Sequence, residues 1–105
     1  MIARIWTGRT PKEKSESYLD YVLRTGVEDH RRTPGNLASW VLRRQAGDQT
    51  EFLVISLWDS IENIAAFAGP DVEKARYYPE DDDYLMDKSE NVTHYEVAYR
   101  AGSET

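Results

Sequence analysis

The sequence contains no cysteine. This absence excludes disulfides, zinc sites built from thiolates, CxxC redox motifs and cysteine nucleophiles. Histidine is scarce as well, because His30 and His94 are the only two and stand far apart in the chain. They form no recognisable metal-binding set, so we expect no metal site.

Positive charge is also in short supply. The chain has 13 Lys and Arg residues against 19 Asp and Glu residues, a formal net charge of −6. Such a chain is not expected to bind nucleic acid or anionic membranes in a general way. No apolar run approaches the ~18 residues of a membrane span, and no charged start with an apolar segment indicates secretion. These absences predict a cytoplasmic protein.

The residues that are present suffice for one small core. The chain has 105 residues, of which 40% are apolar and 30% charged, an ordinary globular balance. We expect a single domain over residues 1–100 and a tail over residues 101–105. The 3 Trp, 7 Tyr and 2 Phe residues are enough to line a pocket or an interface in addition to a core.

Periodicity and turn signals predict four strands and two main helices. The strands are expected at Ile2–Arg9, Asn36–Arg44, Glu51–Trp58 and Val92–Arg100. Thr10 is expected to cap the first helix and Asp59-Ser60 the second, and residues 71–78 are expected to form a short third helical piece. The order β-α-β-β-α-β predicts an α+β, ferredoxin-like fold with a four-stranded antiparallel sheet and helices on one face.

The predicted strand Glu51–Trp58 is largely apolar at both its odd and its even positions. The domain's own helices cover only one sheet face, so something else must cover the other. We expect a two-fold homodimer with sheet packed on sheet. The residues expected at its interface are Trp6, Trp40, Phe52, Val54 and Trp58.

Three segments carry a resemblance to a known family: the first strand with its helix, VISLWDSIENIAAFAGPDVEKARYY, and the closing VTHYEV. Over about residues 2–100 the chain resembles the antibiotic biosynthesis monooxygenase (ABM) superfamily of dimeric α+β barrels. That superfamily includes cofactor-free monooxygenases, quinol monooxygenases and haem-degrading enzymes. The resemblance implies a pocket in each subunit between the sheet and the helices.

The haem-degrading members use an asparagine late in the first strand, a tryptophan on the second helix and a histidine ligand shortly after it. A gapless match places Thr7, Phe67 and Tyr77 at these positions. Tyrosine can ligate haem iron, but the asparagine and the tryptophan are missing. The resemblance therefore implies that haem is disfavoured and that no cofactor is bound. It also implies that the same three residues line the pocket.

His94 is the only histidine inside a predicted strand. Its ordinary pKa suits a general base that deprotonates a phenol or quinol, and a hydrogen-bonded structural histidine is the alternative. Tyr77 and Tyr78 can hold an aromatic ligand by stacking and hydroxyl contacts, unless one of them fills the core. Arg4 shares a strand face with Trp6; it can pair with a carboxylate across the dimer or bind an anion.

These observations predict a cofactor-independent, monooxygenase-like protein that acts on a small aromatic or quinone-like compound. Two alternatives stay open. One is a dimeric module that binds a small apolar or aromatic molecule without converting it, and the other is a dimerisation scaffold whose pocket is filled by side chains. The clusters His30-Arg31-Arg32 and Glu80–Asp83 are expected to be solvated.

Overall fold

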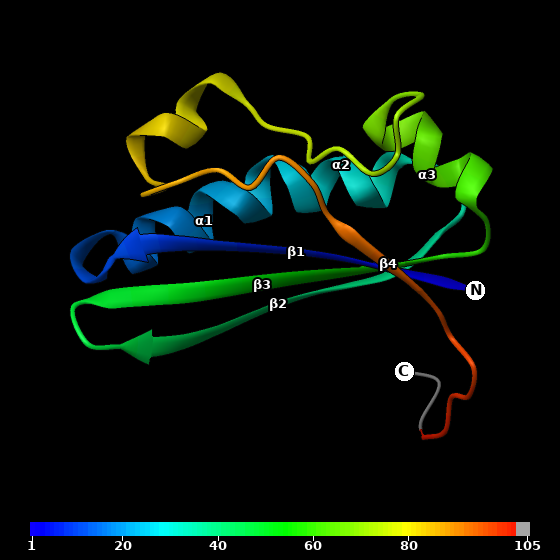
Figure 1. The fold of residues 1–105 in the computed structure, drawn as a ribbon, viewed down its shortest axis with the longest axis horizontal. Coiled ribbons are helices and arrows are strands. Elements are labelled where there is room, and N and C mark those ends of the chain that lie inside the picture. The colour runs from blue at the N-terminus through cyan, green and yellow to red at the C-terminus, as the bar shows by residue number, and fades with distance from the viewer. Residues whose placement is uncertain (103–105) are drawn as a thin grey trace.

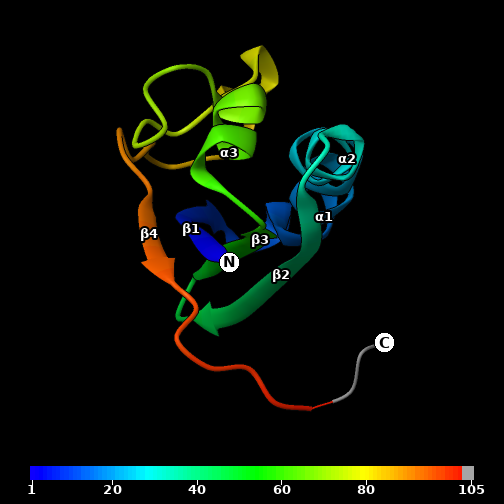
Figure 2. The same cartoon turned by 90° about the vertical axis from the view of Figure 1, so that its right-hand side faces the viewer.

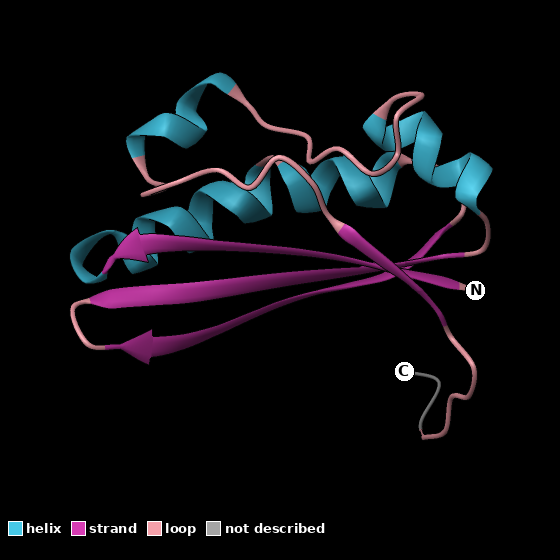
Figure 3. Ribbon diagram, viewed as in Figure 1, coloured by secondary structure: helices cyan, strands magenta, loops and turns pink. Residues whose placement is uncertain are grey.

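The computed structural model describes residues 1–102 as an antiparallel sheet with helices on one face (Figure 1, Figure 3). The elements are β1 Ile2–Pro11, α1 Ser15–Arg24, α2 Gly26–Arg32, β2 Asn36–Ala46, β3 Gln49–Trp58, α3 Ile61–Ala68 and β4 Thr93–Glu96, with 3-10 turns at Lys12–Lys14 and Pro79–Asp83. The strand order is β2-β3-β1-β4, and all neighbours are antiparallel. This is the predicted α+β, ferredoxin-like fold. The end of the predicted tail, residues 103–105, lies outside the described residues.

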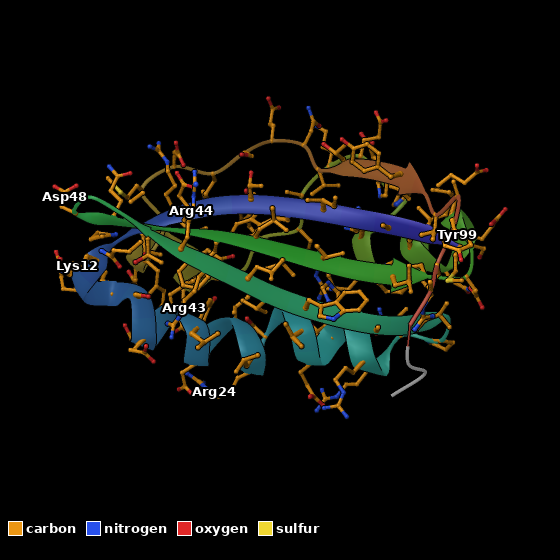
Figure 4. The ribbon with its side chains drawn as sticks, turned by 90° about the horizontal axis from the view of Figure 1, so that it is seen from below. Lys12, Arg24, Arg43, Arg44, Asp48 and Tyr99 are labelled. Atoms are coloured by element: carbon orange, nitrogen blue, oxygen red, sulfur yellow. The ribbon has the colours of Figure 1, made fainter. Side chains whose placement is uncertain are left out.

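Local signals determine where several elements begin and end. Gly47, with a φ of 65°, and Asp48 form the turn between β2 and β3, and Asp48 marks this hairpin tip in Figure 4. The backbone N–H of Asn63 donates to Ser60 Oγ at 3.3 Å, so Ser60 caps α3 as predicted. Thr10 does not cap a helix, because it lies within β1 and its hydroxyl donates to the next carbonyl.

The sheet face beneath the helices carries the even-numbered residues of β1 and β3. In the β1–β3 register, Trp6 lies opposite Val54 and Ile2 lies opposite Trp58. Trp58 is 0% exposed and Phe52 is 1% exposed. These side chains pack against the helices in two adjoining clusters, which together form the core.

The predicted dimer interface is therefore wrong for four of its five residues. Trp6, Phe52, Val54 and Trp58 lie in or against the core beneath the helices. Only Trp40 lies on the uncovered face, where it is 46% exposed. Alternation shows which residues of a strand share a face, but it does not show which of two apolar faces meets the helices.

The opposite face of the sheet is uncovered (Figure 2) and apolar in part. Trp40, Leu42 and Tyr95 are 46%, 49% and 57% exposed, and Leu53 and Ile55 lie opposite Leu42 and Trp40 in the register. Figure 4 looks onto this face. We call it the open face. A surface of this kind is typical of a contact with another molecule.

The segment between α3 and β4 lies on the helix side of the sheet (Figure 1, Figure 2). Residues 71–78 do not form the predicted helical piece. One turn forms at Asp71–Lys74, but the N–H of Ala75 then donates to the Glu90 carbonyl and the Glu73 carbonyl accepts from Val92, so the chain pairs with the stretch around Asn91. β4 is shorter than predicted and ends at Glu96. No helix among residues 1–102 is long and apolar enough to cross a membrane.

Candidate functional site

A cavity of about 60 Å³ lies between the sheet and the helices. Its walls come from β1, β3, α1, α2, α3 and the segment after α3. Its aromatic lining residues are Trp6, Tyr18, Phe67, Tyr77 and Tyr78. Its charged or titratable lining residues, apart from the tyrosines, are Arg4, His30, Arg76 and Asp81. The cavity thus combines flat apolar walls with a small number of polar groups, as ligand sites do.

Tyr77 connects the segment after α3 to the sheet. Trp6 Nε1 donates to the Tyr77 hydroxyl at 3.1 Å, and that hydroxyl donates to the carbonyl of Ser89 at 2.7 Å. The Trp6 and Tyr77 rings meet edge to face with centroids 6.3 Å apart. Burial raises the pKa of Tyr77, so its hydroxyl remains a donor at neutral pH.

Tyr78 closes the cavity on the side of α2. Its hydroxyl donates to Asp29 Oδ2, and Arg76 Nη2 lies 3.3 Å from the same oxygen. Burial and then the hydrogen bond to Asp29 raise the pKa of Tyr78. The Arg76 guanidinium lies 4.9 Å from the Phe67 ring centre and 5.0 Å from that of Tyr78. The Asp29 carboxylate is thus shared by two donors.

Arg4 carries a buried positive charge and is only 4% exposed. Its Nη1 donates to the carbonyl of Val72 and to His94 Nε2 at 3.1 Å, and its Nη2 donates to the carbonyl of Lys74 at 3.0 Å. Within the described part of the chain it forms no ion pair with a carboxylate. Burial lowers the pKa of Arg4 to about 10, which still leaves it charged at neutral pH.

His94 lies opposite Arg4 in the β1–β4 pair and is not one of the residues that line the cavity. Because a guanidinium can only donate, His94 Nε2 must accept, which assigns a neutral ring with its proton on Nδ1. Burial and then the charge of Arg4 lower the pKa of His94. In this arrangement its lone pair is already occupied.

His30 was expected in a solvated loop, but it lies in α2 and is 6% exposed. Its Nδ1 lies 3.1 Å from Ser39 Oγ. Burial and then the charge of Arg4 lower its pKa to about 4, so it lines the cavity as a neutral ring. Tyr18, Val22 and His30 are four and eight residues apart, a spacing that places their side chains on one helical face. This spacing is the sequence signal that could have identified His30 as buried.

The structure brings together three of the four predicted substrate-binding residues. Phe67, Tyr77 and Tyr78 line the same cavity. Thr7 does not, because it lies opposite Leu53 and borders a separate hollow of about 440 Å³ at the open face. A shift of one residue moves a strand side chain to the other face, so Trp6 occupies the place expected for Thr7. The part these residues play in binding stays a prediction.

Several solved structures share this fold. A variant of MhuD with two manganese protoporphyrin IX molecules per active site has a TM-score of 0.63 and 20% identity, over 98% of this chain and 100% of that chain. A candidate antibiotic biosynthesis monooxygenase from Bacillus cereus has a TM-score of 0.62 and 17% identity, over 97% and 95%. The haem-degrading MhuD from Mycobacterium tuberculosis, with two haems in its active site, has a TM-score of 0.60 and 22% identity, over 97% and 100%.

No protein-family model and no curated protein sequence matches the chain. The identities to the three structures are low, so the likeness is one of fold. The chain has the ferredoxin-like fold of the ABM structures, as the resemblance implied.

These structures correct the prediction that no cofactor is bound. Two of the three hold porphyrins in their active sites, so a porphyrin is possible on this fold. The present arrangement does not fit one, because about 60 Å³ is far below the roughly 300 Å³ at which ligand pockets begin. The lone pair of His94 and the hydroxyl of Tyr77 are also hydrogen-bonded. Among residues 1–102, no three His, Asp or Glu side chains converge as a metal site.

Proposed function

We propose that this protein is a monooxygenase-type protein that binds a small aromatic or quinone-like compound between its sheet and its helices. The observation that carries the proposal is the convergence of Trp6, Phe67, Tyr77 and Tyr78 on one cavity. Aromatic walls with few polar groups suit a flat ring. The ABM fold of the structural neighbours supports an oxygenation reaction.

Binding requires the cavity to widen, because its volume is about 60 Å³. The segment over residues 69–92 is the wall best suited to move, since its only helical element is a short 3-10 turn. It is held by hydrogen bonds, such as those of Tyr77, and by the packing of Tyr84 and Leu85 against α1 and the core. Opening the part that carries Tyr77 breaks these hydrogen bonds and leaves the strand pairing of the sheet intact.

The side chains support deprotonation of a ring hydroxyl as the first step. Loss of that proton makes the ring richer in electrons and more reactive toward dioxygen. The predicted role of His94 as the base sets two conditions. Its Nε2 must be released by Arg4, and the cavity must widen as far as His94, which does not line it in the present arrangement. The hydroxyls of Tyr77 and Tyr78 have raised pKa values and keep their protons, which they donate to the Ser89 carbonyl and to Asp29. They can donate to oxygens on the ring once these two bonds break.

We also propose a homodimer joined through the open face. Trp40, Leu42 and Tyr95 are about half exposed there and would be covered by the same face of a second copy. The small volume of the cavity favours one alternative function, which is a dimerisation scaffold whose pocket is filled by its own side chains.

Tryptophan fluorescence tests the proposal directly. Titration with 1,4-naphthoquinone should quench the wild-type protein with saturation, because Trp6 lines the cavity. Trp6→Phe should lose most of this quenching, whereas Trp40→Phe, on the open face, should retain it. Consumption of dioxygen with 1,4-naphthohydroquinone then separates turnover from binding.

The same titration includes haem, followed by its absorbance, as a second ligand. Saturable binding of either compound that depends on Trp6 supports a ligand site. Absence of saturable binding by both compounds, in a folded dimer, would contradict the proposal and favour the scaffold.

A further inference from the structure

We infer that the ligand of the cavity carries an anionic oxygen on its aromatic ring system, either a carboxylate or an ionised enol, and that Arg4 binds this oxygen. The inference rests on the proposed function and names the substrate class of the same site.

Burial is the first reason. Arg4 lines the cavity and is 4% exposed, and no other arginine or lysine among residues 1–102 is buried. Burying a cation without a counter-ion is unfavourable, since uncharged partners replace water only in part. All partners of Arg4 are uncharged: the carbonyls of Val72 and Lys74 and the neutral ring of His94. An anion in the cavity would complete this set.

The donor count of the guanidinium is the second reason. A guanidinium has five N–H groups. Nη1 uses both of its hydrogens, on Val72 and on His94, and Nη2 uses one, on Lys74. The Nε–H and one Nη2–H therefore have no acceptor in the described part of the chain. Two free donors on a cavity wall suit an oxygen anion, which a guanidinium binds better than a neutral acceptor.

The other charges at the cavity do not take this role. Asp29 is shared by Arg76 and the Tyr78 hydroxyl. Asp81 accepts from the backbone N–H of Tyr78 at 2.6 Å. His30 is neutral above about pH 4, as its lowered pKa of about 4 shows. Arg76 already has its carboxylate, so Arg4 is the cation left for a ligand.

The aromatic walls orient the rest of the molecule. The Arg4 guanidinium lies 5.8 Å from the centre of the Phe67 ring. A ligand ring packed beside Phe67 and Trp6 would thus bring a substituent on its edge to Arg4.

Matched ligand pairs test the inference. The pairs are 2-naphthoate with 2-naphthamide, and 2-hydroxy-1,4-naphthoquinone, whose enol is strongly acidic, with 1,4-naphthoquinone. We expect the anion of at least one pair to bind the wild-type protein about 10- to 100-fold more tightly than its neutral partner, from the usual strength of a charge-assisted hydrogen bond. Preference in the first pair indicates a carboxylate, and preference in the second indicates an ionised enol.

Arg4→Met should abolish the preference while the neutral compounds still bind. Arg44→Met is the matched control, because Arg44 lies on β2 in an exposed pair with Glu51 and should leave the preference unchanged. Should Arg4→Met fail to fold, Arg4→Lys is the second variant. It keeps the positive charge but lacks the planar set of guanidinium donors, and should reduce the preference severalfold.

The outcomes separate this inference from the proposed function. Equal binding of the anionic and neutral compounds by the wild-type protein would overturn the inference and leave the proposed function standing. A preference that persists in Arg4→Met, or in a folded Arg4→Lys at full strength, would overturn it as well. Binding of none of the four compounds would instead contradict the proposed function.

Discussion

Acid is expected to weaken the fold through His30. The ring lies edge-on to Phe67 and Trp58, with centroids 4.6 and 5.9 Å away, and is 6% exposed. Burial and the charge of Arg4 lower its pKa from 6.5 to about 4, against a smaller opposing effect of Asp29. Between these pH values the folded state binds fewer protons than the unfolded chain, so the free energy of unfolding falls as the pH falls. The full difference corresponds to about 3 kcal/mol.

Urea unfolding at pH 7, 6 and 5 measures this effect. The stability from His30 is fully present above its unfolded pKa of 6.5 and is lost progressively toward its folded pKa of about 4. His30→Asn retains a polar group near Ser39 but cannot titrate, so it should be less stable at pH 7 and show a flatter pH dependence. His94→Asn serves as the control and should keep most of the slope. Equal slopes in the wild type and His30→Asn would refute the reasoning.

Three further changes test the fold and the open face. Ser60→Ala removes the side-chain acceptor for the Asn63 N–H and should lower the free energy of unfolding by about 1 kcal/mol in urea. Phe52→Ala empties a 1% exposed site that packs against Tyr18, and should cost about 3–5 kcal/mol in the same assay; a loss below 1 kcal/mol would mean that this face is not the core. Trp40→Glu should give a monomer with an unchanged circular dichroism spectrum, measured by sedimentation velocity. An unaltered dimer would exclude Trp40 from the interface.

The order of elements and the pairing of strand faces could be predicted from the sequence, because both depend on local periodicity. The alternation of side chains along a strand correctly placed Trp6 and Thr7 on opposite faces of the sheet. It could not decide which face meets the helices, since odd and even positions of β3 are both apolar. Exchanging the two faces of the sheet placed Trp58 at an interface and Thr7 at the cavity. In the structure Trp58 lies in the core and Thr7 borders the open face.

A residue of the candidate site could be predicted only where the periodicity of its own helix or strand determines the direction of its side chain. Phe67 lies on the inner face of α3, as its helical spacing indicated. Arg4 was recognised as a candidate for binding an anion, but its hydrogen-bond partners come from a segment about 70 positions away. No local pattern shows that its guanidinium lacks a carboxylate as an ion-pair partner. His30 was missed because glycine is a weak helix former, so Gly26 concealed that the helical face continues after the break at Thr25 into α2.

A crystal structure of the protein with 2-naphthoate tests the central claim most directly. The naphthalene ring should lie between the sheet and the helices, in contact with Trp6 and Phe67, with residues 69–92 displaced outward. The carboxylate should lie about 3 Å from the Arg4 guanidinium. A ring found on the open face, or in the cavity with its carboxylate turned away from Arg4, would contradict the account.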